Sequence, residues 1–129
     1  MYTAAIDALP GVGDPEFADR AAVVLSGLRK LQASLGEAAG RSRVTPSVIV
    51  ALSGVRTRYD ELMTTAAEGP GATLGQRLYV ARGRAKLSAA EAANGIGVRQ
   101  DLIEAVEAEE QATEAETGQI KDLIAALGG

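Results

Sequence analysis

Arginines and carboxylates are the side chains of this chain that could do chemistry, because its 129 residues include no His and no Cys. Without Cys, the chain cannot form disulfides, thiolate zinc sites or a Cys nucleophile. Without His, it lacks the usual general base and the commonest metal ligand, and a Ser-His-Asp triad is excluded. We therefore expect a protein that is not an enzyme and holds neither cofactor nor metal. Carboxylate-only catalysis is the weakest of three functional hypotheses.

The charged residues are unevenly distributed along the chain, whose net charge is −4. No acidic residue lies between Glu37 and Asp60, and this stretch contains four arginines, Arg41, Arg43, Arg56 and Arg58. Residues 101–122 instead contain eight carboxylates and Lys121 as the only base. Because affinity for DNA comes largely from neutralised phosphates, the first stretch suits DNA and the second would be repelled by it.

Composition favours helices, since 25 residues are Ala, the best helix former, and only four are aromatic. Helix starts are marked by N-cap and capping-box patterns. These patterns are Asp14-Pro15-Glu16, Thr45-Pro46, Ser34 with Glu37, Thr73 with Gln76, Ser88 with Glu91, and Thr113 with Glu116. They predict an all-α protein of nine or ten short helices.

The Gly69-Pro70-Gly71 run cannot continue a helix and divides the chain near its middle. The two halves resemble each other at an offset of 54 residues, which relates Ser34 to Ser88 and Ile49 to Ile103. We therefore predict two small helical units in tandem. The expected boundaries are an N-terminal arm over 1–13, a first unit over 14–68, a linker over 69–73 and a second unit over 74–129.

The second half predicts four helices with a tight turn after the second. Gly97 stands where the turn needs a positive φ, and apolar residues recur on one face of each predicted helix. The half resembles the lambda-repressor-like, Cro-type (XRE) helix-turn-helix family. The residues that carry the resemblance are Leu74-Gly75, Arg77-Leu78, Leu87-Ser88, Glu91-Ala92-Ala93, Gly97-Val98, Ile103, Val106 and Glu107.

The first half looks like a weaker copy of the same pattern. Ala39, Val44, Ile49 and Leu52 match the family's apolar positions, and Thr45 to Ser47 resembles the start of its third helix. The sequence departs from the family at Ser42 and Arg43, which stand where an apolar residue and the turn Gly are expected. We therefore expect a degenerate helix-turn-helix unit here.

The resemblance implies a small regulator of transcription that binds duplex DNA by occupying a site. In the family, the third helix enters the major groove and its N-terminal half reads base edges. In the second unit this role falls to Arg99 and Gln100, which suit G and A edges. In the first unit the expected DNA contacts are Arg41, Arg43, Thr45, Ser47, Arg56 and Arg58.

A second hypothesis is an interaction or dimerisation module that has lost DNA binding. Within the predicted helix over 45–53, the segment Val48–Leu52 is apolar all round, and such a helix is usually covered on both faces. Its expected partner-binding residues are Val48, Val50 and Ala51, and the partner would be a second copy or another protein. The sequence lacks a signal-peptide pattern and a membrane-length apolar run, which predicts a cytoplasmic protein without a membrane partner.

Overall fold

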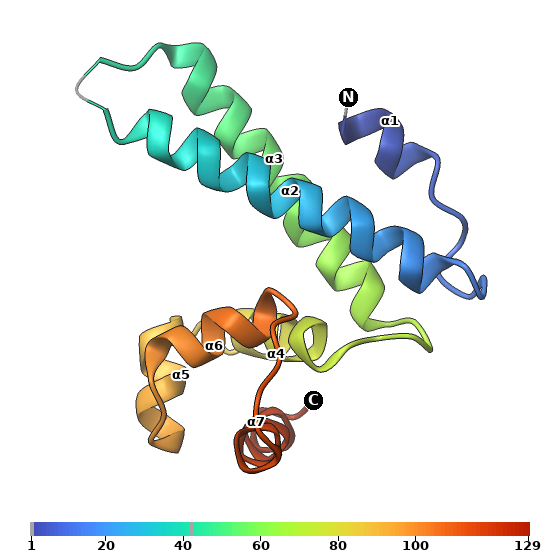
Figure 1. Ribbon diagram of the computed structural model, residues 1–129, viewed down its shortest axis with the longest axis vertical. Helices are drawn as coiled ribbons and strands as arrows, with labels where there is room; N and C mark the ends of the chain where they lie inside the picture. The colour runs from blue at the N-terminus through green and yellow to red at the C-terminus, as the bar shows by residue number, and fades with distance from the viewer. Residues whose placement is uncertain (1, 42) are drawn as a thin grey trace. The chain divides into compact units, whose positions relative to one another are not determined.

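The computed structural model describes residues 2–41 and 43–129, so Met1 of the expected arm and the expected core position at Ser42 lie outside it. The described residues form seven helices and no strand, which confirms an all-α protein with fewer and longer helices than expected. The chain divides into two compact units, Met1–Gly71 and Ala72–Gly129, and the boundary between them falls within the expected linker (Figure 1).

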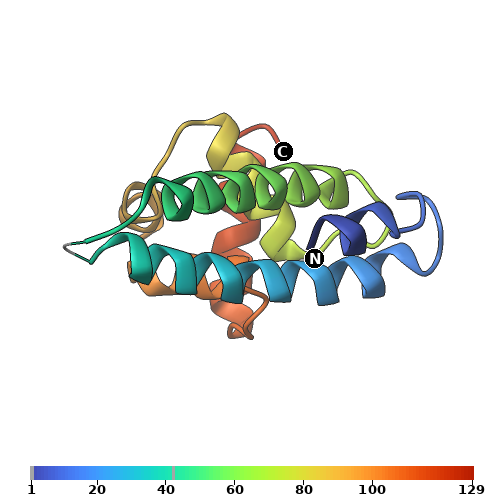
Figure 2. The same cartoon turned by 90° about the horizontal axis from the view of Figure 1, so that it is seen from above.

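The first unit is a hairpin of two long helices, α2 (Phe17–Ala39) and α3 (Pro46–Ala67), with the short helix α1 (Tyr2–Asp7) packed against α2. Figure 2 shows α1 beside the end of the hairpin where α2 begins and α3 ends. The buried side chains form one stripe on each long helix. These residues are Phe17, Ala21, Leu25 and Leu28 of α2, and Leu52, Val55, Tyr59, Leu62, Met63 and Ala66 of α3.

This architecture corrects the prediction of a helix-turn-helix unit over 14–68. The capping pattern at Ser34 lies inside the 23-residue helix α2, which continues to Ala39. Residues 30–33, directly before Ser34, include neither glycine nor proline and are mostly good helix formers, so nothing ends the helix ahead of this local start signal. The start at Thr45-Pro46 is confirmed, with Thr45 as N-cap and Pro46 as the first helical residue.

Two further boundaries differ from the prediction. Helix α2 begins at Phe17, because Asp14 instead closes a turn in which its Oδ1 accepts the backbone N–H of Glu16 at 2.9 Å. The expected arm is part of the first unit, since Ile6, Leu9 and Val12 are half-buried against the hairpin.

The second unit consists of α4 (Leu74–Arg84), α5 (Ala89–Ile96), α6 (Gln100–Glu107) and α7 (Glu114–Ala126). The capping boxes at Thr73, Ser88 and Thr113 are all formed. Backbone hydrogen bonds in two of these boxes lower the pKa of the Glu91 and Glu116 carboxyls. The predicted inward faces are confirmed, and they build a core of Leu78, Ala81, Ala92, Ala93, Leu102, Ile103, Val106, Ile120 and Ile124.

Two glycines shape this second core. Gly97 ends α5 in the left-handed conformation, with φ at 72°, and turns the chain directly into α6 as the sequence predicts. Gly75 lies where α4 crosses α6, and a Cβ at this position would overlap the backbone carbonyl oxygen of Val106. The absence of a side chain at Gly75 therefore lets the two helices approach closely.

Among the described residues, no helix combines the length and the apolar character that a membrane span requires.

We predict that Gly75→Ala lowers the free energy of unfolding by about 1–3 kcal/mol, because the backbone of Val106 must move to admit the methyl group. Urea denaturation followed by circular dichroism measures this change. Gly83→Ala is the matched control on the same helix, where a Cβ meets no atom within 4 Å. The control should be neutral or gain up to about 1 kcal/mol. Equal effects of the two substitutions would contradict the close approach at Gly75.

Candidate functional site

Helix α6 presents an acidic outward face. Its inward face buries Leu102, Ile103 and Val106, whereas Gln100, Asp101 and Glu104 are exposed. Arg99, the N-cap residue, donates from Nε to Asp101 Oδ1 at 2.9 Å. Gln100 donates from Nε2 to Glu104 Oε1 at 3.0 Å. The structure thus brings the two expected base-reading side chains together, and it bonds each of them to a carboxylate of the same helix.

An ion pair that the sequence did not reveal joins α4 to α6. Arg82 donates from Nε and Nη2 to the two carboxylate oxygens of Glu107, at 2.8 and 2.7 Å. Its Nη1 donates to the carbonyl oxygen of Leu87 at 2.9 Å. Only 20% and 10% of the two side chains are exposed, and the hydrogen bond to Glu107 raises the pKa of Arg82. This pair fixes the C-terminal end of α6 on α4.

The arginines expected to bind DNA in the first unit do not form one patch. Arg41 and Arg43 are exposed in the loop between α2 and α3, near Thr45 and Ser47, whose hydroxyls are 2.8 Å apart. Arg56 is exposed on α3, about 15 Å along the helix axis from Pro46. Arg58 forms ion pairs with Asp7, at 3.9 Å, and with Glu61, at 3.8 Å. The loop groups are therefore close together, and Arg58 lies apart from them, paired with Asp7 of α1.

The hairpin has two ends of different character, which we call the proximal end (residues 2–20 and 60–71) and the distal end (residues 31–51). Helix α1 lies at the proximal end (Figure 2). Among residues 29–41 and 43–51 none is buried. Of the expected partner-binding residues, Val48 is half-buried, Ala51 is exposed, and the Val50 side chain is 71% exposed. The distal end therefore offers apolar surface to solvent.

Two residues of the distal end correct the sequence-based prediction. Val44 and Ile49 were expected to face a core, but they are 37% and 49% exposed. The reason is that the core of a helix-turn-helix unit does not form here, so these side chains have no third helix to contact. The helix expected from the sequence ends at Ser53. If residues 46–67 are treated as one helix, the helical periodicity places Ile49 outside the buried stripe.

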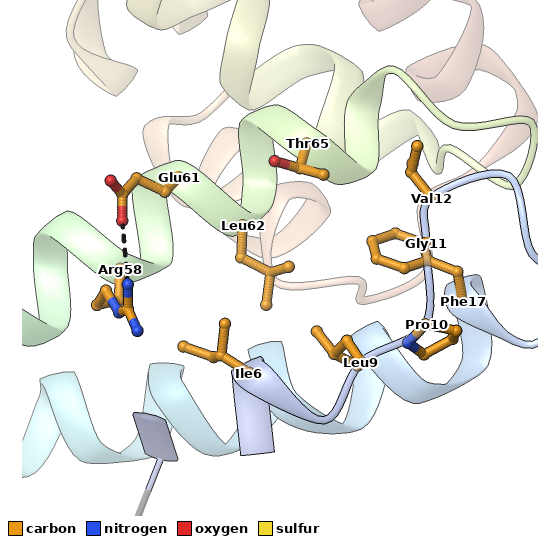
Figure 3. Close-up of a pocket in the computed structure, with 10 residues that line it drawn as sticks. All are labelled: Ile6, Leu9, Pro10, Gly11, Val12, Phe17, Arg58, Glu61, Leu62 and Thr65. Carbon is orange, nitrogen blue, oxygen red and sulfur yellow. Dashed lines mark ion pairs between the residues drawn. The ribbon is translucent and has the colours of Figure 1, made fainter. Parts of the chain in front are cut away.

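A cavity of about 370 Å³ lies at the proximal end, and no sequence pattern predicted it. It lies between α1 with its following loop and α3, as Figure 3 shows. Ile6, Leu9, Phe17 and Leu62 contribute apolar side chains, and the Arg58–Glu61 ion pair lies at one side. Polar groups do not converge in it as they do in most small-molecule sites, so it defines only a packing seam.

Comparison with known proteins assigns the chain to a family. A family model described as MSMEG_6518_N, an N-terminal domain, matches residues 2–73. The chain belongs to this family. An uncharacterised protein of Mycolicibacterium smegmatis (strain ATCC 700084 / mc(2)155) is 89% identical over 129 residues, which is 100% of both chains. No solved structure matches the chain. The matched residues comprise the described hairpin and α1, so the family domain coincides with the first unit.

We predict that Glu107→Gln lowers the free energy of unfolding by about 2–3 kcal/mol, since it leaves the charge of Arg82 partly buried without a negatively charged partner. The loss is smaller than for a fully buried pair, because a fifth of Arg82 is exposed. Thermal and urea denaturation measure it.

The matched control is Glu110→Gln, an exposed residue just beyond α6, which should stay within about 0.5 kcal/mol of the parent chain. The double variant Arg82→Met with Glu107→Leu should recover most of the lost stability. A loss from Glu107→Gln no larger than that of the control would contradict a structural role of the pair.

Proposed function

We propose that the protein is a non-catalytic cytoplasmic module that acts through protein–protein contacts. In this proposal α5 and α6 form a helix-turn-helix pair that resembles the XRE family. This pair no longer reads DNA through α6. The observation that carries the proposal is the acidic outward face of α6, on which Asp101 and Glu104 hold the side chains of Arg99 and Gln100.

The arrangement of α4 to α7 supports the helix-turn-helix part of the proposal. Helices α5 and α6 are joined by the three residues 97–99, and the turn requires the left-handed conformation of Gly97. In such a pair the second helix would point its N-terminal half at the base edges of the major groove. Arg99 and Gln100 occupy that half of α6, so the backbone is compatible with DNA recognition.

The side chains oppose that recognition. Arg99 would have to leave Asp101 before it could contact a guanine, and the freed carboxylate would then approach the phosphates. Residues 72–129 contain six basic and nine acidic residues, so the whole second unit carries a net charge of −3. Affinity for DNA comes mainly from the neutralisation of its phosphates. The phosphates would therefore repel this acidic unit.

A DNA-binding regulator is the second candidate function, and the exposed cations of α4 favour it. Arg77, Arg84 and Lys86 are exposed and have no ion-pair partner within residues 2–41 and 43–129. Cations beside a helix-turn-helix pair contact phosphates in many complexes. Arg41, Arg43 and Arg56 could add contacts from the first unit if both units reached one duplex.

We predict that the parent chain shows no binding to mixed duplex DNA at ~50 mM salt, where phosphate contacts are strongest. The variant Asp101→Asn with Glu104→Gln should gain salt-dependent binding, because the amides release Arg99 and remove two charges from α6. Fluorescence anisotropy with a labelled duplex measures both.

The matched control is Glu114→Gln with Asp122→Asn, which changes the net charge equally at exposed positions of α7. It should bind no better than the parent chain. Tight, salt-dependent binding by the parent chain would overturn the proposal and establish the regulator. If the α6 variant gained no more binding than the control, α6 would not be a recognition helix, and the helix-turn-helix part of the proposal would fail.

A further inference from the structure

The apolar seam covered by α1 at the proximal end continues along the hairpin without a cover. On α2, Phe17 lines the cavity beside α1, and Val24, Leu31 and Ala38 follow it at intervals of seven residues. On α3, Ala51 precedes Arg58 by seven residues and Leu62 by eleven. Arg58 and Leu62 also line that cavity. Residues at these spacings share one face of a helix.

We call the uncovered part of this seam the distal face, formed by Leu31, Leu35 and Ala38 of α2 and Ala51 of α3. The first three are half-buried and Ala51 is exposed. At the proximal end, the same seam buries Phe17 and Leu62, each at 6% exposure. The two ends differ in burial because an apolar helix face is buried only where another element packs against it. The distal face therefore lacks a third layer.

The charges of the first unit are segregated between the proximal end and the rest of the hairpin. The proximal end carries seven acidic residues and one basic residue, a net charge of −6. The rest of the first unit, residues 21–59, carries six basic residues and Glu37, a net charge of +5. Arg58 is paired with Asp7 and Glu61, and Arg29 donates to the hydroxyl of Tyr59. The remaining cations are Lys30, Arg41, Arg43 and Arg56.

We propose that a second copy of this chain covers the distal face, so that two hairpins pair antiparallel through their first units. Antiparallel pairing directs the basic loop residues Arg41 and Arg43 of each copy toward the acidic proximal end of the other. Parallel pairing would bring these arginines against their own copies and would be repelled. A two-fold arrangement uses the same face on both copies, and two paired helical hairpins form a four-helix bundle.

This inference deepens the proposed protein-contact function and rests on it. It names the partner and the face, and it uses none of the residues of α6. The size of each hairpin suits the pairing, because α2 alone extends about 35 Å at 1.5 Å per residue. Such a length allows the two distal faces to overlap while each α1 stays on its own hairpin.

The test measures the mass of the full chain by light scattering coupled to size exclusion, at tens of micromolar and low salt. The parent chain should show about twice its mass of 13.2 kDa, and Ala51→Glu should return it to 13.2 kDa. Because Ala51 is exposed, the substitution leaves the monomer folded, which circular dichroism checks. The matched control is Ser53→Glu, an exposed residue two positions along α3 on another face, which should stay dimeric.

Charge reversal tests the orientation. Arg41→Glu with Arg43→Glu should weaken an antiparallel dimer at least tenfold, since the reversed loop then faces the partner's acidic end. A parallel dimer would not respond, because like charges would still meet at the loop. High salt should weaken the parent dimer by screening.

A parent chain that stays at 13.2 kDa would overturn this inference, as would a dimer that tolerates Ala51→Glu as well as it tolerates Ser53→Glu. A dimer that is indifferent to the loop reversal would overturn the antiparallel arrangement. None of these outcomes depends on DNA. If the chain is a monomer and also fails to bind DNA, this inference fails, but the proposal that α6 no longer reads DNA stands.

Discussion

Two helices packed side by side bury only the stripe along which they touch, and this constraint governs the first unit. Each long helix needs a further element to bury the rest of its apolar surface. Helix α1 supplies that element at the proximal end, where Phe17, Leu62 and Met63 are buried. At the distal end Leu31 and Leu35 remain half-buried. The uneven burial of one continuous hairpin thus comes from the shortness of α1, which has six residues.

The second unit satisfies the same constraint within itself. Four short helices surround one core, and the absence of a side chain at Gly75 allows two of them to cross in close contact. Its carboxylates serve different purposes according to position. Glu107 is buried with Arg82 and fastens two helices, whereas Asp101 and Glu104 remain exposed and restrain the side chains at the start of α6. The acidic composition of residues 101–122 is therefore partly structural and partly a surface property.

Local signals predicted the second unit well and the first unit poorly, for one physical reason. The capping box of Ser88 and Glu91 forms because α4 has ended before it, and Gly97 allows the tight turn that follows. The equivalent pattern of Ser34 and Glu37 fails because no residue just before it ends α2, which continues through it to Ala39. Sequence spacing revealed which residues of α6 face outward. It could not reveal that Arg82 reaches Glu107, since that contact depends on how two helices cross.

All of the side-chain capping boxes described in the chain start helices of the second unit, whereas α2 and α3 begin without a side-chain cap bond. Helices α4, α5 and α7 of the second unit are therefore stabilised locally at their starts, whereas α6 and the two helices of the hairpin depend on packing. The hairpin packs least at its distal end, so opening of the backbone begins there at the lowest cost in free energy. Amide hydrogens in the last turns of α2 and the first turns of α3 would then exchange with solvent before those near Met63, and any cover of the distal face would slow that exchange.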